Sequence, residues 1–599
     1  MPQPRFDPRA PRATRLRGVE LWNFKSIRRD VVDVAPLTLV AGSNSAGKSS
    51  LLQAVLALTQ VTRRRIDGHR FPLNGDLVHL GLFDGVRHQR AESDEIVGIG
   101  IRFTSTDRDV RAATPFRGRS LGSPGAGSPR PREVSEVDVR WVVEWDEAVK
   151  DQIGAAQIAA IELQVKATDL HVSTRLERTA EGSGIPKPVD HPDDVAFTGT
   201  LRAGDTETAV LDALISSAQI GAVWGIPPTP ATRVRDWFLA LADSGQDEAE
   251  PFTLSGDQAL FGNGTTGLDR EKAIQQAAWA VEHEVPAEPD FVAWYGALDE
   301  VAQEHVEHDV LAQFVAEQDR RKGATRSEAR VLQTRGATQL YGAQAACSRF
   351  LSTRVRYIGP LRHAPHLPFP AAPDPDLDDV GISGEHVASV LQANQSVEQP
   401  LPVPGGGLQR LTVVAAVTRW LAHFGLADHI AVREDMPLVL GIDVIPSGLE
   451  RAVPLGAVGV GVSQVLPVIV QCLVAGPGAL IVLEQPELHL HPGAQQRLGD
   501  FLLACSEWGQ CLLVESHSEY LVLRLRRRVA EGRVDKDQLA LLFAIRDEQG
   551  STTYQPVELT DAGAVVEWPE GFFDQGPDEA HQLLIAAAKK QRSREEELP

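Results

Sequence analysis

Apolar runs near both ends of the chain give the strongest secondary-structure pattern. Leu37, Leu39 and Val40 form a short β-like apolar run, and leucines and valines then recur at helical spacing over residues 51–58. Far downstream, residues 479–484 and 511–515 are apolar runs that end in glutamate. Each run is typical of a core strand, and each lies close to a segment with helical character. The pattern therefore predicts the α/β fold class.

A long apolar segment precedes the run at residues 479–484. Residues 455–474 read LGAVGVGVSQVLPVIVQCLV. The segment opens with four small or polar residues: Gly459, Gly461, Ser463 and Gln464. We expect a helix that begins there, with Pro467 in its first turn, where proline is tolerated. Such a helix start offers backbone N–H groups and a hydroxyl to an anion.

Between the two ends the pattern changes three times. Residues 117–132 are rich in Gly, Pro, Ser and Arg and predict a mobile surface loop. Residues 137–145 and 160–172 alternate apolar and polar side chains, which predicts strands. From about 229 to 350 the spacing becomes helical, without the sustained heptads of a long coiled coil. We expect a compact helical subdomain there.

Composition and charge narrow the class of protein. The 599 residues include 81 acidic and 59 basic side chains, for a net charge of −22, and 43% are hydrophobic. This hydrophobic content supports packed cores. The four cysteines lie in apolar runs without a CxxC pair, which argues against disulfides and a structural zinc site. With no leader and no apolar run of ~18 residues, we expect a cytoplasmic protein without membrane contact.

Residues 42–49 spell a phosphate-binding motif. Gly42 to Ser49 match G-x-x-x-x-G-K-[ST] between the predicted strand and helix. The two glycines let backbone N–H groups close around a polyphosphate at a helix N-terminus. Lys48 can bridge the β- and γ-phosphates of ATP, and the Ser49 hydroxyl can ligate Mg²⁺. The predicted nucleotide-binding residues are Gly42, Asn44, Ser45, Ala46, Gly47, Lys48, Ser49 and Ser50.

Polar residues end the two downstream strands. Glu484 ends the run ALIVLE, which is the form of a strand whose terminal carboxylate holds Mg²⁺. We predict that Ser49 and Glu484 hold this ion. His517 follows the run that contains CLLVE.

The order of these motifs resembles the ATPase heads of the ABC superfamily. The phosphate loop, the glycine- and serine-rich helix start, the strand ending at Glu484, the sequence HLHP and the strand before His517 occur in that order. The chain looks most similar to SMC-like and OLD-like bacterial AAA-type ATPases of phage-defence and DNA-repair systems, whose heads dimerise around two ATP molecules.

The resemblance assigns further roles. It implies that Gly461, Ser463 and Gln464 form the signature that contacts the γ-phosphate bound by the opposite subunit, and that His517 is the switch histidine. His491 falls at the D-loop position, although the H-x-H spacing with His489 would also suit a metal. The resemblance further implies a P-loop ATPase head that is split by an insertion. The N-terminal lobe would span residues 1–104, the mixed β/helical insertion 105–353, the C-terminal lobe 354–575, and a charged tail 576–599.

The residue after Glu484 departs from the ABC pattern. Gln485 stands where an ABC ATPase has its catalytic glutamate, and an amide cannot accept a proton from water. ATP hydrolysis is then either slow, or another side chain serves as the general base. Glu487 is the first candidate for positioning or activating water, and Glu515 is the second. For the glutamine loop, Gln89 or His88 could touch Mg²⁺ or water, unless residues 73–90 form a solvent-facing loop.

Basic clusters leave room for a nucleic-acid partner. The candidate contacts are Arg321, Lys322, Arg326, Arg526 and Arg527. These clusters could line a groove on the acidic body, or they could be solvated helix faces.

We expect an ATP- and Mg²⁺-dependent ATPase that forms a homodimer or higher homo-oligomer on ATP. It would act as sensor or scaffold in a bacterial anti-phage defence system with a separate effector protein, a nuclease, because only about 80 residues follow His517, which leaves little room for an appended nuclease domain. The alternative is an SMC-like ATP-gated DNA clamp in DNA repair or chromosome maintenance, and a transporter ATPase is a weaker third hypothesis.

Overall fold

The computed structural model describes both ends of the chain and part of its middle. The described residues are 14–63, 70–92, 95–106, 136–147, 156–167, 170–178, 195–203, 206–215, 343, 346–363, 369–370, 378–436, 439–569, 573, 579 and 582–587. The expected loop at 117–132 and nearly all of the expected helical subdomain at 229–350 lie outside them. Within the described ranges, no helix has both the length and the apolar content that a membrane crossing requires.

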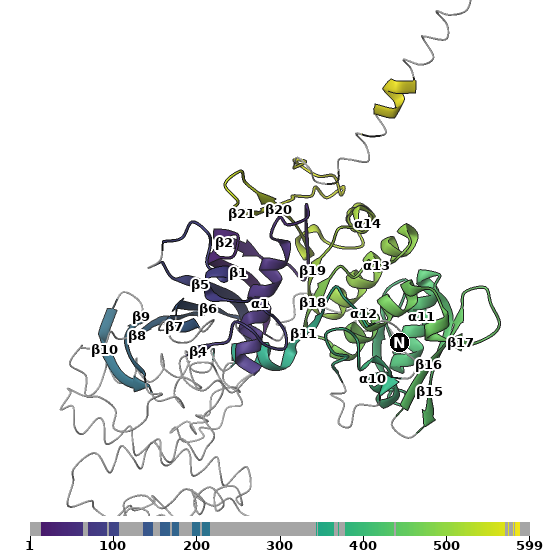
Figure 1. Ribbon diagram of the computed structural model, residues 1–599, viewed down its shortest axis with the longest axis horizontal. Coiled ribbons are helices and arrows are strands. Elements are labelled where there is room, and N and C mark those ends of the chain that lie inside the picture. The colour runs from purple at the N-terminus through teal and green to yellow at the C-terminus, as the bar shows by residue number, and fades with distance from the viewer. Residues whose placement is uncertain are drawn as a thin grey trace, which may run out of the picture.

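A six-stranded sheet carries the phosphate loop. Its strands are β3 (Leu37–Gly42), β11 (Val355–Ile358), β18 (Leu480–Glu484), β19 (Cys511–Glu515), β20 (Leu539–Arg546) and β21 (Thr552–Pro556). Their order is β11-β18-β19-β3-β20-β21, and every pair is parallel except β20 and β21. The N-terminal strand β3 therefore lies between two strands from the C-terminal part of the chain (Figure 1). This arrangement confirms the predicted α/β class.

Burial of both faces of this sheet explains the continuous apolar runs. In β3, Val40 belongs to one hydrophobic core and Leu39 to the other. In β18, Val482 and Leu483 divide between the same two cores. Because successive side chains of a strand point to opposite faces, a strand that is apolar at every position fills both cores.

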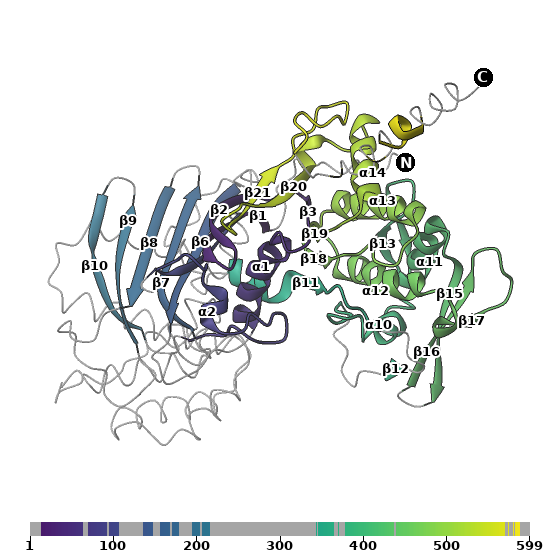
Figure 2. The same ribbon diagram turned by 45° about the horizontal axis from the view of Figure 1, so that its top comes forward.

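Helix α1 (Lys48–Arg63) and a large antiparallel sheet close the first core. The order in this sheet is β10-β9-β8-β7-β6-β5-β1-β2, with β4 paired to β7. Its strands are β1 (Arg15–Phe24), β2 (Ile27–Asp33), β4 (Arg70–Phe71), β5 (Val97–Thr106), β6 (Glu136–Glu147), β7 (Ala156–Ala167), β8 (Leu170–Arg178), β9 (Val195–Ala203) and β10 (Thr206–Ile215). Helix α1 lies between this sheet and the parallel sheet (Figure 2). Residues 137–145 lie within β6, whereas residues 160–172 span the end of β7 and the start of β8.

Helices close the second core on the opposite face of the parallel sheet. They are α10 (Val387–Ala393), α11 (Val413–Phe424), α12 (Val460–Ala475) and α13 (Pro492–Trp508), with α14 (Glu519–Ala530) packed beside α13. Short strands surround them: β12 (Phe369–Pro370), β13 (Gln399–Pro402), β14 (Leu408–Leu411), β15 (Ala427–Met436), β16 (Val439–Pro446) and β17 (Val453–Pro454). The remaining short turns are α2 (Phe83–Val86), η1 (Leu455–Ala457) and η2 (Lys536–Gln538).

Helix α12 shows that the predicted place of Pro467 was wrong. The helix begins at Val460, so Pro467 lies in its interior and not in its first turn. A proline there has no N–H for the carbonyl group one turn earlier, which belongs to Ser463. Tertiary packing holds the helix in spite of this loss, because most of its residues are buried. The Pro467 ring also packs closely on Gly384, where a Cβ would lie 2.4 Å from Pro467 Cγ.

An ion cluster around Asp500 joins three helices. Asp500 of α13 accepts hydrogen bonds from Arg524 Nη2 and Arg528 Nε of α14, both at 2.7 Å. His423 Nε2 of α11 lies 3.5 Å from Asp500 Oδ2. Burial opposes ionisation of this carboxyl, but His423, Arg524 and Arg528 hold the pKa of Asp500 well below its ordinary value. The cluster therefore contributes most where Asp500 is charged.

We expect Asp500→Ala to lower the free energy of unfolding by about 2–4 kcal/mol at pH 7, because Arg524 loses its acceptor. Urea unfolding measures this change. Since the folded-state pKa is depressed, the difference from the wild type should be present above the ordinary carboxyl pKa and should disappear as the pH falls through the folded-state pKa. Asp561→Ala is the control, because Asp561 is 91% exposed and pairs with Lys536 at the surface. Equal losses in the two variants would contradict the structural role of the cluster.

Candidate nucleotide-binding site

The phosphate loop joins β3 to α1 and borders a cavity of 580 Å³. Six of the predicted nucleotide-binding residues line this cavity: Asn44, Ser45, Gly47, Lys48, Ser49 and Ser50. The first five belong to the motif, and Ser50 is the residue that follows it. Ala46 is buried, and Gly42 ends β3. Lys48 Nζ donates hydrogen bonds to the carbonyl oxygens of Gly42 at 3.1 Å and Ser43 at 2.6 Å. Because α1 begins at Lys48, the free N–H groups of its first turn lie at the loop.

Close backbone approaches require both glycines of the motif. Gly42 has φ +148°, and a Cβ there would lie 2.7 Å from the Ala544 carbonyl oxygen of β20. Gly47 has φ +93°, and its Cβ would lie 2.6 Å from Thr552 Oγ1 and 2.7 Å from Ser26 Oγ. A side chain at either position would combine a clash with an unfavourable backbone conformation. The motif therefore depends on neighbours that are distant in sequence.

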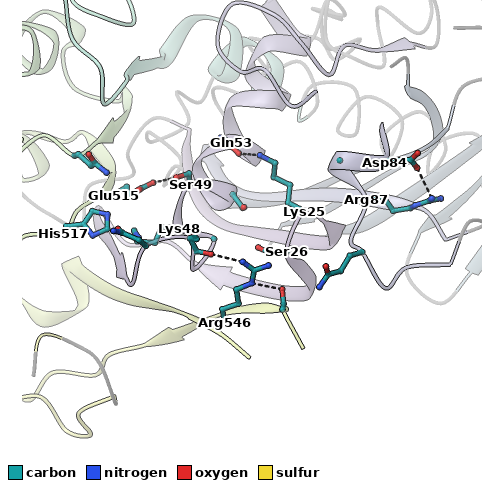
Figure 3. Close-up of a pocket in the computed structure, with 18 residues that line it drawn as sticks. Lys25, Ser26, Lys48, Ser49, Gln53, Asp84, Arg87, Glu515, His517 and Arg546 are labelled. Carbon is teal, nitrogen blue, oxygen red and sulfur yellow. Dashed lines mark hydrogen bonds and ion pairs between the residues drawn. The ribbon is translucent and has the colours of Figure 1, made fainter. Parts of the chain in front are cut away.

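Two carboxylates end adjacent parallel strands beside the loop. Glu484 of β18 and Glu515 of β19 are register partners. Glu515 lines the cavity, and its Oε2 accepts a hydrogen bond from Ser49 Oγ at 2.7 Å (Figure 3). Glu484 Oε1 accepts a hydrogen bond from Tyr357 Oη at 2.9 Å. The strand that precedes His517 thus brings a second acid to the site.

The charge of Glu515 opposes ionisation of Glu484. Burial and the nearby Glu515 raise the pKa of Glu484 to about 7. Burial also raises the pKa of Glu515, although the hydrogen bond from Ser49 and the charge of Lys48 act against this shift. A buried carboxylate pair of this kind favours either a shared proton or a bound cation.

Gln485 and Glu487 have different surroundings. Gln485 lines the cavity, has φ +46°, and donates its backbone N–H to the Glu515 carbonyl oxygen at 2.8 Å. Glu487 is only 6% exposed and is absent from the cavity lining. Its Oε1 accepts a hydrogen bond from the backbone N–H of His517 at 2.7 Å. Arg362 Nη2 donates to the carbonyl oxygens of Glu484 at 2.8 Å and Gln485 at 3.1 Å. Glu487 and Arg362 therefore hold the turns that carry Gln485 and His517.

His517 lies at the cavity beside the phosphate loop (Figure 3). Burial and the charge of Lys48 lower the pKa of its imidazole. A neutral imidazole can donate one hydrogen bond and accept another.

The start of α12 is not part of this cavity. Ser463 is 4% exposed, and its hydroxyl donates to the Val460 carbonyl oxygen at 2.8 Å. A Cβ on Gly461 would lie 3.1 Å from the His489 carbonyl oxygen, so the helix start packs on the segment after β18. Gln464 is also buried, with 6% of its surface exposed. His491, the predicted D-loop residue, caps α13: its Nδ1 accepts a hydrogen bond from the Gly493 N–H at 3.3 Å. A contact of these residues with a second subunit stays a prediction.

Of the two candidates for the glutamine loop, Gln89 lines the cavity, and its Nε2 donates to the Gln549 carbonyl oxygen at 3.1 Å. His88 is 1% exposed, and its Nε2 lies 3.1 Å from Ser551 Oγ.

Sequence reasoning missed three cationic residues in the cavity wall. Lys25 lies in the turn between β1 and β2, with Nζ 2.5 Å from Gln53 Oε1. Arg87 pairs with Asp84 at 3.1 Å. Arg546 ends β20 and donates to the Ser45 carbonyl oxygen at 3.3 Å. A polar residue after an apolar run could have indicated Arg546, because the carboxyl ends of parallel strands meet at one edge. No comparable signal marks Lys25 or Arg87.

A protein-family model matches one part of the chain that contributes to this site. Residues 432–524, which include Glu484 and His517, match a model described as "AAA domain, putative AbiEii toxin, Type IV TA system". The strand of the phosphate loop pairs with β19 from that range. The parallel sheet with its phosphate loop resembles the arrangement of an ABC-type P-loop ATPase head. Residues 534–583 match a second model, described as a protein of unknown function (DUF3696).

Solved structures of SMC head domains match the chain at low sequence identity and low TM-score. The SMC head domain from Thermotoga maritima has 10% sequence identity and a TM-score of 0.29, covering 91% of this chain and 100% of that chain. The Smc head domain from Pyrococcus furiosus, with an extended coiled coil and bound to the C-terminal domain of ScpA, has 12% identity and a TM-score of 0.32. It covers 91% of this chain and 96% of that chain. No curated protein matches the chain.

The basic residues Arg526 and Arg527 of α14 have partners among the described residues. Arg526 Nε donates to the Gly563 carbonyl oxygen at 3.0 Å, and its guanidinium lies 5.1 Å from the centre of the Trp568 ring. Arg527 Nε donates to Glu531 Oε1 at 2.7 Å. These contacts favour a role in packing over a nucleic-acid groove at this helix. The other cluster, with Arg321, Lys322 and Arg326, lies outside the described residues.

We expect Glu484→Gln to stabilise the nucleotide-free protein by up to about 3 kcal/mol at pH 8, and by much less at pH 5. Between the ordinary carboxyl pKa and about 7, folded Glu484 holds more proton than the unfolded chain, so its contribution to stability falls as the pH rises. Urea unfolding across this pH range measures the difference from the wild type. Exposed Glu558→Gln is the control. A Glu484→Gln difference that does not change with pH would contradict the buried carboxylate pair.

Proposed function

We propose that the protein binds Mg²⁺–ATP at the phosphate loop and hydrolyses it. The main support is that the pairing of β3, β18 and β19 places residues 42–49 at the same edge of one sheet as Glu484 and Glu515. Glu515 lines the cavity beside the loop, whereas Glu484 is buried at the end of the neighbouring strand. The loop N–H groups and Lys48 would bind the β- and γ-phosphates. His517 borders the same cavity and would contact the γ-phosphate.

The oxygen ligands at this edge suit Mg²⁺. The Ser49 hydroxyl and the Glu484 carboxylate are the predicted ligands, and both are hard oxygen donors. The raised pKa of Glu484 supports the fit, because a divalent cation would compensate the two buried negative charges. When bound, Mg²⁺ would offset the charge of the phosphates.

Glu515 is the carboxylate that we assign to water activation, ahead of Glu487. It borders the cavity next to Ser49, whereas Glu487 is engaged by the His517 N–H. Gln485 also borders the cavity and can orient a water molecule through its amide. In hydrolysis Glu515 would accept a proton from the attacking water.

Three variants test these assignments. Lys48→Ala should abolish ATP binding, because the phosphates lose their main cationic ligand. Glu515→Gln should keep ATP binding and lower kcat by about 100-fold, since the amide cannot take the proton. Glu487→Gln should keep kcat within a few-fold of the wild type. Phosphate release and binding of a fluorescent ATP analogue measure the two quantities. A normal kcat in Glu515→Gln together with a large loss in Glu487→Gln would return the role to Glu487.

We further propose that ATP brings two or more copies together, and that this assembly acts as sensor or scaffold in a bacterial anti-phage defence system with a nuclease as separate effector. The description of the matched family as part of a Type IV toxin–antitoxin system supports a role alongside another protein. Val460 at the start of α12 is 51% exposed, three residues before Ser463. This apolar exposure supports contact of the helix start with a second copy.

Val460→Arg should prevent assembly on ATP without preventing ATP binding, because it places a charge where an apolar contact is expected. Light scattering with ATP, with ADP and without nucleotide measures the mass. Leu449→Arg is the matched control, since Leu449 is 59% exposed in the turn between β16 and β17. A wild-type protein that stays monomeric with bound ATP would contradict the proposal. ATP-dependent retention on closed duplex DNA without an effector would favour the clamp alternative.

A further inference from the structure

Side chains of the β20–β21 hairpin bind three consecutive carbonyl groups of the phosphate loop. Arg546 Nη1 donates to the Ser45 carbonyl oxygen at 3.3 Å (Figure 3). Thr552 Oγ1 donates to the Ala46 carbonyl oxygen at 2.8 Å, and Tyr554 Oη donates to the Gly47 carbonyl oxygen at 2.7 Å. The loop is thus held, residue by residue, by a segment about 500 positions later in the chain.

These contacts bear on anion binding because the two polar groups of a peptide unit point in opposite directions. A phosphate loop binds its ligand through N–H groups that converge on one point. Hydrogen bonds that hold the carbonyl groups on the far side also fix the direction of the N–H groups. Ser45 has φ +62°, a conformation that disfavours an L residue by about 1 kcal/mol or more and that its neighbours must maintain.

The hairpin is itself anchored to β2 of the large sheet and to the turn between β1 and β2. The Thr552 N–H donates to the Ser26 carbonyl oxygen at 2.6 Å, and Thr552 Oγ1 also lies 2.8 Å from Ser26 Oγ. The Tyr554 N–H donates to Asp30 Oδ2 at 2.7 Å. Thr552 and Tyr554 are only 1% and 6% exposed, so water does not replace these contacts readily. The two hydroxyl groups therefore belong to a rigid support.

We propose that the β20–β21 hairpin pre-organises the phosphate loop, with Thr552 and Tyr554 as positioning residues for the polyphosphate of the nucleotide. The hairpin lies within the range that matches a family of unknown function, and this role gives that segment a task in ligand binding. The inference rests on the proposed binding of ATP. Because the hairpin acts on the loop backbone, its effect applies to the phosphate chain and is independent of the base.

The test removes each hydroxyl group alone. Thr552→Val and Tyr554→Phe should each weaken the binding of Mg²⁺–ATP about tenfold, since a buried carbonyl loses its donor and the loop loses order. Inorganic tripolyphosphate with Mg²⁺ should be weakened by the same factor. Calorimetric titration of the full chain measures both ligands. Thr552→Ser keeps a hydroxyl group and should restore binding to within about twofold of the wild type.

Thr553→Val is the matched control, because Thr553 is exposed on the opposite face of the same strand. It should bind both ligands as the wild type does. Wild-type affinity in both Thr552→Val and Tyr554→Phe would overturn the inference and leave ATP binding intact. Equal weakening in Thr553→Val would also overturn it, since the effect would then come from general loss of the hairpin. A wild-type protein that binds neither ligand would instead refute the proposed function. If Thr552→Val does not fold, Tyr554→Phe decides the outcome.

Discussion

The pairing of β3 with β19 on one side and β20 on the other is the interaction on which the rest of the structure depends. It places the phosphate loop, the acid that ends β19 and the arginine that ends β20 at one edge of a sheet. Ser49 and Glu515, 466 positions apart in sequence, form a hydrogen bond only because of this pairing. Parallel strands require long connections, so a site of this kind can tolerate a large segment between its halves.

The site combines an apolar sheet with buried charges. Glu484, Glu487 and Glu515 are each less than 9% exposed, and burial raises the pKa of all three. Buried acids oppose folding unless they are protonated or compensated. Glu487 is compensated by a backbone N–H, whereas Glu484 and Glu515 face each other across adjacent strands. Ionisation of both acids therefore costs stability at this edge of the sheet.

Rigidity at the phosphate loop comes from outside the motif. Gly42 and Gly47 allow β20 and β21 to approach the loop, and the hairpin then supplies donors for the loop carbonyl groups. On the other side, Arg362 and Glu487 hold the turns after β18 and β19. Short backbone segments therefore enclose the cavity. Side chains that do not line the cavity, such as Thr552, Tyr554, Arg362 and Glu487, hold these segments in place.

Local pattern was sufficient for the α/β class, the strands β3, β18 and β19, and the phosphate loop, because buried parallel strands and a loop–helix junction leave signals within a few residues. It was not sufficient for the interior place of Pro467, for the cavity positions of Lys25 and Arg87, or for the contact between Ser49 and Glu515. These features depend on the direction in which a side chain points from its turn, and on which strands become neighbours in the sheet. The sequence by itself determined the chemistry of the loop and the acids at the strand ends. Only the tertiary structure decided which acid meets Ser49 and which residues hold the loop, because strand order brings together groups that are hundreds of residues apart.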